Sequence, residues 1–167
     1  MKKIKTPCVG LCSTVYGDLV CRGCKRYDYE IIAWNGYEED QKHAVMQRLD
    51  ILLAQAMAGK CEVFDIDCMM TGVQLLRIHG CSPAFVHHCA YQIITRGSSV
   101  INSLEEYGIR VLPAAASLRL TELRDILDQA FFELSHSVLE ADKRQLAFVR
   151  LSNGVAMQQI STSCRES

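Results

Sequence analysis

The chain has 167 residues, of which 49% are hydrophobic and 22% are charged, so it can build one core of ordinary size and carry a small additional module. Its formal net charge of −1 argues against a protein that coats nucleic acid through overall charge. The sequence shows neither an 18-residue apolar run nor a signal-peptide pattern, so we expect a cytoplasmic protein without a membrane-spanning helix.

The first predicted element is a cysteine cluster. Four cysteines occur within seventeen residues of the stretch PCVGLCSTVYGDLVCRGCKR. They form two pairs, with three residues between the first two cysteines and two residues between the last two. Each pair suits a tight turn whose sulfurs face one tetrahedral metal. A dense cysteine pattern in a reducing compartment also favours a metal site over a disulfide framework. Because thiolates suit both metals, we expect one Zn²⁺ or an iron–sulfur cluster as the cofactor. The predicted metal ligands are Cys8, Cys12, Cys21 and Cys24.

Local signals around the cysteines predict how their turns form. The segment STVYGDLV places Gly17 and Asp18 between two short runs of β-type residues, which indicates a hairpin that returns the second cysteine pair to the first. Gly23 can adopt a positive φ and so direct backbone N–H groups toward sulfur. A segment this small needs help to fold, and a structural zinc site supplies on the order of 10 kcal/mol. Two alternatives stay open: a redox dithiol at Cys21 and Cys24, and cysteines that only fill space.

Charge is distributed unevenly in the same part of the chain. Residues 1–27 contain six basic side chains and one acidic one, whereas residues 28–40 contain five acidic side chains and no basic one. Such asymmetry is typical of an anion-binding surface, but basic residues that offset the charge of metal thiolates would produce the same pattern. The candidates for contact with an anion or a partner are Lys3, Lys5, Arg22, Lys25 and Arg26.

The runs PCVGLC, CRGCKR and YEIIAW together resemble a known family. They are similar to the bacterial family called domain of unknown function 1289, whose members are often labelled predicted iron–sulfur proteins. The resemblance covers residues 6–52 and implies four metal ligands without naming a reaction. Lys25 departs from the family pattern, which has a small residue there. The matching positions are Pro7, Cys8, Cys12, Cys21, Gly23, Cys24, Arg26, Glu30, Ile31 and Trp34.

Two helices are predicted after the cysteines. Asp28 can cap a short helix over residues 29–34, in which Trp34 is expected to be a core anchor. Apolar residues then recur at helical spacing from residue 39 to 57, and Gly59 is expected to end that second helix.

The rest of the chain is predicted to be mostly helical. Residues 61–80 indicate a short extended piece followed by a helix that Asp67 or Thr71 could cap and that ends at Gly80. Further helices are predicted over residues 83–97 with Ser82 as N-cap, over residues 98–107 before Gly108, and over residues 118–151, the last one continuous or broken near residues 140–142.

A second group of metal-binding residue types lies between His79 and Cys89. His88 and Cys89 would point in different directions on a helix, so buried small cysteines are favoured there over a second metal site. The usual catalytic signatures for phosphate, dinucleotide, zinc-protease and serine-hydrolase sites are absent, so enzyme status is unsupported.

We therefore predict a mainly α protein in which a small four-cysteine metal-knuckle and hairpin module precedes a helical domain. The expected divisions are residues 1–58, residues 59–151 and a flexible tail over residues 152–167. The favoured function is a non-catalytic metal-binding module with a protein or nucleic-acid partner, and the sequence indicates neither a membrane partner nor a small-molecule substrate. The alternatives are an iron–sulfur redox or sensor protein and an enzyme with a site around His87 and His88.

Overall fold

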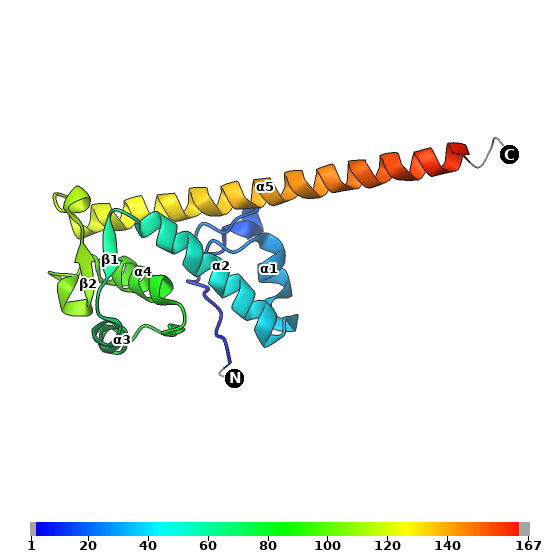
Figure 1. The fold of residues 1–167 in the computed structure, drawn as a ribbon. Coiled ribbons are helices and arrows are strands. Elements are labelled where there is room, and N and C mark those ends of the chain that lie inside the picture. Colours follow the sequence, from blue (N-terminus) through cyan, green and yellow to red (C-terminus); the bar gives the residue numbers. More distant parts are fainter. Residues whose placement is uncertain (1–2, 164–167) are drawn as a thin grey trace. The chain divides into compact units, whose positions relative to one another are not determined.

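Helices make up most of the described chain (Figure 1). The computed structural model describes residues 3–163, with side chains described for residues 3–146. Five α-helices and one two-stranded sheet within these residues confirm the mainly α fold class. The elements are α1 (Asp28–Ala33), α2 (Glu39–Met57), β1 (Cys61–Val63), α3 (Ile66–Leu75), α4 (Val86–Gly97), β2 (Ile109–Val111) and α5 (Leu120–Ser163), with 3₁₀ turns at Ser13–Tyr16, Trp34–Gly36, Glu105–Tyr107 and Pro113–Ala115.

The chain divides into two units, Met1–Ser135 and His136–Ser167. The first unit contains all elements before α5 together with the first part of that helix, and the second contains the rest of it. The cysteine segment and the helices that follow it thus share one unit, and independent folding of residues 1–58 stays a prediction.

The tail predicted over residues 152–167 falls largely on α5. The helix extends to Ser163, residues 164–167 lie outside the described residues, and flexibility of this segment stays a prediction. Among the described residues, no helix combines the length and apolarity needed to cross a membrane.

The predicted hairpin lies at a different place from the one expected. Residues Ser13–Tyr16 form a 3₁₀ turn closed by Gly17, rather than a strand leading into a turn at Gly17 and Asp18. The antiparallel contact is instead a bridge between Val20 and Tyr27, so the turn that it encloses contains the second cysteine pair itself. The physical reason is local, because the Ser13 hydroxyl accepts the Arg22 N–H at 2.9 Å and holds the preceding segment in the turn.

Helix α1 begins one residue before the predicted helix. Tyr27, not Asp28, is its N-cap, and the Glu30 carboxylate accepts the Tyr27 N–H at 2.8 Å. The same carboxylate forms an ion pair with Arg48 of α2 at 2.7 Å, which ties α1 to α2. Trp34 is buried, consistent with a core anchor.

Helix α2 has the predicted bounds, because its apolar spacing and the glycine that follows it act together. The helix runs Glu39–Met57, and Gly59 has a φ of +73° that a side chain would strain. Its buried face packs against α4, which also contacts α3 and β1. The core of the first unit contains Ala90, Ile93 and Ile94 of α4.

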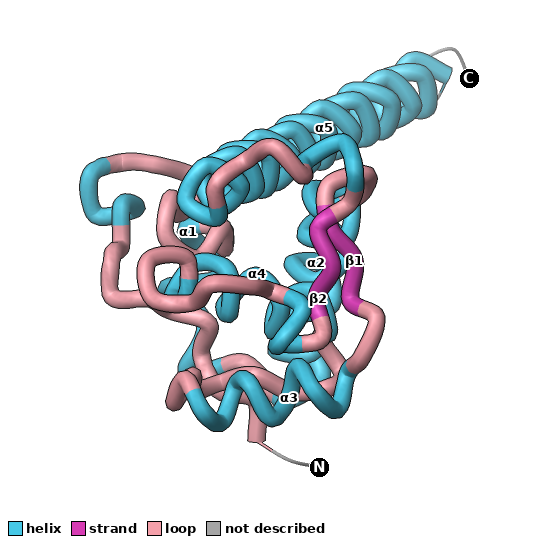
Figure 2. Tube along the Cα trace, turned by 90° about the vertical axis from the view of Figure 1, so that its left-hand side faces the viewer, coloured by secondary structure: helices cyan, strands magenta, loops and turns pink. Residues whose placement is uncertain are grey.

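The two strands lie side by side at the edge of this helical core (Figure 2). They are antiparallel, with Cys61 opposite Val111 and Val63 opposite Ile109. The extended piece predicted at residue 61 therefore pairs with a strand 48 residues further along the chain, a partnership that the sequence of neither strand signals alone.

The predicted boundaries of α3 and α4 are wrong by several residues. The Asp65 carboxylate caps α3 by accepting the Cys68 N–H at 2.9 Å, so neither Asp67 nor Thr71 is the cap, and the helix ends at Leu75. Helix α4 starts at Val86 because the Phe85 N–H bonds to the Ser82 carbonyl at 2.9 Å and closes a separate turn.

The helix predicted over residues 98–107 is wrong, whereas the long helix predicted from residue 118 is present. Residues 98–107 contain only the 3₁₀ turn Glu105–Tyr107, closed by Gly108 at a φ of +68°. Helix α5 is continuous through residues 140–142, so the single-helix alternative is the one observed.

Candidate metal centre

Two of the four predicted ligands, Cys21 and Cys24, lie together in one turn. Cys21 is 1% exposed and Cys24 is 7% exposed, and the Cys24 side chain contributes to the lowered pKa of the Cys21 thiol. The turn is closed by the Cys21 N–H bonded to the Arg26 carbonyl at 2.9 Å and by the Lys25 N–H bonded to the Cys21 carbonyl at 2.8 Å. A Cys-x-x-Cys turn with adjacent sulfurs is the local geometry that a tetrahedral metal uses.

The backbone around Cys21 lowers the pKa of its thiol. Burial raises the pKa of the Cys21 thiol, but hydrogen bonds from the backbone of Cys24, Ser13 and Gly23 outweigh it, so the pKa lies below the ordinary value. The pKa of Cys24 is raised, chiefly by burial and despite a hydrogen bond from Arg26. Cys21 is therefore the thiol of the pair that the fold prepares to ionise.

Gly23 has a role other than the predicted one. Its φ is not positive, whereas Lys25 has a φ of +56° and provides the left-handed residue of the turn. A Cβ on Gly23 would lie 2.6 Å from the Leu11 carbonyl oxygen and 2.8 Å from a methyl group of Val9. Glycine is required there because the segment that joins the first cysteine pair packs directly on the second.

The first cysteine pair does not complete the site. Cys8 is exposed and its sulfur accepts the Gly10 N–H at 3.4 Å, while the half-buried Cys12 sulfur lies 3.1 Å from the Thr14 hydroxyl. Nowhere in the described residues do three or more histidine, cysteine or acidic side chains form a group that could hold a metal. The four-cysteine set, as positioned, does not form such a group, and ligation by Cys21 and Cys24 stays a prediction.

The predicted basic surface is divided between interior and exterior. Lys25 is 0% exposed, and its ammonium contacts the Asp128 carboxylate, the Tyr91 hydroxyl at 3.3 Å and the Gly23 carbonyl at 3.4 Å. The same ammonium lies 5.7 Å from the centre of the Tyr91 ring, within cation–π range. Lys25 is thus an internal residue that joins the cysteine turn to α4 and α5.

Arg26 is also buried, with its Nε donating to the Cys24 sulfur at 3.4 Å and its guanidinium 4.6 Å from the centre of the Trp34 ring. Arg22 remains exposed but forms an ion pair with Asp18 at 3.2 Å. The burial of Lys25 and Arg26 argues against their contact with an external anion, which leaves Lys3 and Lys5 as the exposed candidates without an ion pair among the described residues.

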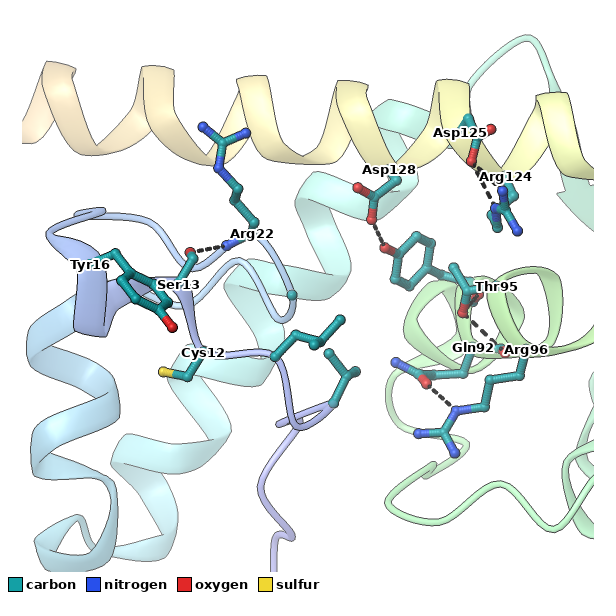
Figure 3. Close-up of a pocket in the computed structure, with 14 residues that line it drawn as sticks. Cys12, Ser13, Tyr16, Arg22, Gln92, Thr95, Arg96, Arg124, Asp125 and Asp128 are labelled. Atoms are coloured by element: carbon teal, nitrogen blue, oxygen red, sulfur yellow. Dashed lines mark hydrogen bonds and ion pairs between the residues drawn. The ribbon is translucent and has the colours of Figure 1, made fainter.

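A cavity of about 830 Å³ lies between the cysteine segment, α4 and α5. Figure 3 shows Cys12, Ser13 and Tyr16 on one side of it and Gln92 and Arg96 of α4 on the other. Its remaining lining includes the apolar side chains of Val9 and Leu11, the ring of Tyr91, and the charged side chains of Arg22, Arg124, Asp125 and Asp128.

Sequence reasoning missed Tyr91 and Asp128. Burial first, and then the hydrogen bond to Asp128, raises the pKa of the Tyr91 hydroxyl. Neither residue carries a sequence signal, because each belongs to an ordinary helical pattern and acquires its role only from contact with Lys25, 66 and 103 positions earlier in the chain.

The histidines and cysteines between residues 79 and 89 are used locally. The Cys81 and Cys89 thiols hydrogen-bond to each other, and the Asp50 carboxylate contacts the His87 ring at 3.1 Å and the His88 N–H at 2.7 Å. The His88 side chain is buried. This arrangement explains why these residue types crowd together without forming a joint site among the described residues.

Comparison with known proteins found no match among curated proteins and none among solved structures. A family model does match the N-terminal part. Residues 6–52 match the family described as "Protein of unknown function (DUF1289)", which confirms for that part of the chain the resemblance drawn from its cysteine spacing.

Proposed function

We propose that residues 6–52 form a cysteine-ligated metal module and that the chain acts as a non-catalytic metal-binding protein. The observation that carries this proposal is the buried Cys21 and Cys24 pair in one Cys-x-x-Cys turn, in which backbone hydrogen bonds lower the pKa of the Cys21 thiol. Such hydrogen bonds stabilise a thiolate, and an ionised sulfur in a buried position requires a positive partner, which a divalent metal supplies.

The first pair would complete the site by a local change. Cys8 and Cys12 lie on a segment without helix or strand, which includes Gly10 at a φ of +85°. Leu11, between them, already contacts the turn, because its carbonyl oxygen accepts the Cys21 thiol at 3.4 Å. Closure of four thiolates around a metal would couple folding of this segment to metal binding, as in other small metal modules.

The test is elemental analysis with an absorption spectrum on protein purified without oxygen and without added metal. The proposal expects either about one zinc per chain without visible absorption, or iron with sulfide and a broad band near roughly 400 nm. The second result would favour the iron–sulfur redox or sensor alternative. Serine substitutions of Cys8, Cys12, Cys21 and Cys24 should each lower the metal content.

Cys68→Ser is the matched control. Its thiol is half-buried outside the module and donates to the Glu106 carbonyl at 3.3 Å, a bond that a hydroxyl can replace. Unchanged metal content in both Cys21→Ser and Cys24→Ser would overturn the proposal, and so would equal loss in the control.

A protein is the favoured partner. Of the basic side chains predicted to meet a partner, Lys25 and Arg26 are buried and Arg22 is ion-paired, which weakens the case for phosphate contacts. Large apolar side chains are instead exposed next to the cysteines, with Leu11 at 74% and Tyr16 at 90% exposed, and such exposure is typical of protein contact surfaces. A nucleic-acid partner would be recognised by affinity that falls steeply with salt.

The enzyme alternative has less support. His88 is buried, and neither His87 nor His88 lines the cavity beside α5 or the smaller one described below.

A further inference from the structure

A second cavity, of about 530 Å³, gathers positive charge from three separate stretches of the chain. We call it the basic cavity. Its charged lining consists of Lys3, Lys5, Lys42 and Arg96. His79 also lines the cavity, and no acidic side chain does. Cations gathered at one concave site repel one another, so a bound anion would stabilise the arrangement.

One carboxylate compensates part of this charge. Glu39 accepts the Lys42 ammonium at 3.0 Å through one oxygen and the Ile4 N–H at 2.6 Å through the other. These two bonds, the Ile4 N–H foremost, hold the pKa of Glu39 below its usual range. Glu39 therefore stays ionised, orients Lys42 and fixes the N-terminal segment that carries Lys3 and Lys5.

The other cations form no ion pair of this kind, although Lys3 lies near enough to Glu39 to help lower the pKa of that carboxyl. Within the part of the chain whose side chains are described, no carboxylate lies within ion-pair distance of Lys3, Lys5 or Arg96. Arg96 is oriented by a bond from its Nε to the Gln92 amide oxygen at 3.1 Å, and Gln92 is itself buried. The arrangement is a positioned guanidinium with flexible ammonium groups around a concave space, which suits a phosphate group.

We propose that the basic cavity binds a small ligand that carries a phosphate group. Its volume lies within the range of small-molecule sites and is too small for a nucleic-acid helix. Ile4 and Trp34 add apolar wall beside the cations, so the ligand would have a compact organic body next to its phosphate. This inference goes beyond the metal proposal. None of the four cations is a predicted metal ligand, although the predicted ligand Cys8 also lines the cavity.

Trp34 is an intrinsic fluorescence probe for this site. Trp34 is the only tryptophan in the sequence, and it lines the basic cavity. Ligand binding should therefore change the tryptophan fluorescence of the full-length protein, and a titration with inorganic phosphate and with pyrophosphate measures it. Pyrophosphate, with more negative charge, should bind more tightly than phosphate.

Arg96→Gln and Lys5→Ala should each weaken pyrophosphate binding by about tenfold, because a charge-assisted hydrogen bond to an anion is lost. Arg110→Gln is the matched control, since Arg110 is an exposed arginine on β2 whose ion pair with Glu62 at 2.9 Å lies outside the cavity. It should bind pyrophosphate as the wild type does. Far-UV circular dichroism confirms that each variant retains the fold.

Three results would overturn the proposal. The first is no fluorescence change with either anion, and the second is an equal change with sodium chloride at the same ionic strength. The third is a single-stranded RNA that binds more tightly than pyrophosphate and loses affinity in Arg96→Gln, which would assign the cavity to a nucleic acid. Metal content is measured separately, so none of these results decides the metal proposal.

Discussion

Replacing Asp128 by asparagine tests whether the buried lysine depends on a single carboxylate. The Lys25 ammonium is completely buried and contacts the Asp128 carboxylate, while its other contacts, the Tyr91 hydroxyl and the Gly23 carbonyl, are neutral. The Tyr91 hydroxyl donates to the same carboxylate. Asp128→Asn keeps the side-chain shape and removes the only negative charge that contacts this ammonium among the described residues.

The expected loss of stability follows from burial. Removing one partner of a fully buried ion pair costs about 3–5 kcal/mol. Because the Asp128 side chain is 47% exposed and water can reach it, we reduce this to about 2 kcal/mol. The control is Asp125→Asn on the same helix, where a 66% exposed carboxylate pairs with Arg124 at 2.7 Å and should contribute less than about 0.5 kcal/mol.

The assay is urea unfolding at pH 7 followed by far-UV circular dichroism, compared among the wild type and both variants. Adding Lys25→Met to Asp128→Asn should recover most of the loss, because the unpaired ammonium is then absent. The reasoning is refuted if Asp128→Asn and Asp125→Asn agree within about 0.5 kcal/mol, since exposed substitutions commonly have effects of that size.

Two further predictions follow from burial and close packing. Gly23→Ala should destabilise the protein by about 1–3 kcal/mol because the added Cβ would meet the Leu11 carbonyl at 2.6 Å, whereas Gly36→Ala meets nothing within 4 Å; equal urea midpoints and equal protease resistance of the two variants would contradict this. Burial lowers the pKa of His88 from 6.5 to about 4, so the folded state favours the neutral ring. Above pH 6.5 the ring is neutral in both the folded and the unfolded state, and its titration costs no folding free energy. Stability should then fall by up to about 3 kcal/mol as the pH drops from 6.5 to 4. His88→Gln should flatten that dependence, and an unchanged slope in urea unfolding would show that another group causes it.

The local features of the chain could be predicted because their causes lie within a few residues of each other. The bounds of α2 follow from apolar spacing and a glycine shortly after its end, and the family resemblance of residues 6–52 follows from the cysteine runs and the YEIIAW run after them. Predicted helix boundaries were wrong where two local signals compete. Ser82 and Pro83 resemble a helix start, but the Phe85 N–H bonds back to Ser82 and closes a turn instead.

Tertiary contacts decided the features that give the candidate sites their chemistry. By itself, the sequence determined the helical class, the cysteine motif and the excess of positive charge near the start of the chain. It could not show that Lys25 is an internal residue, because its carboxylate partner is 103 positions away. Nor could it show that Lys3, Lys5, Lys42 and Arg96 share one cavity, since charge and burial at a site depend on segments that only the folded chain brings together.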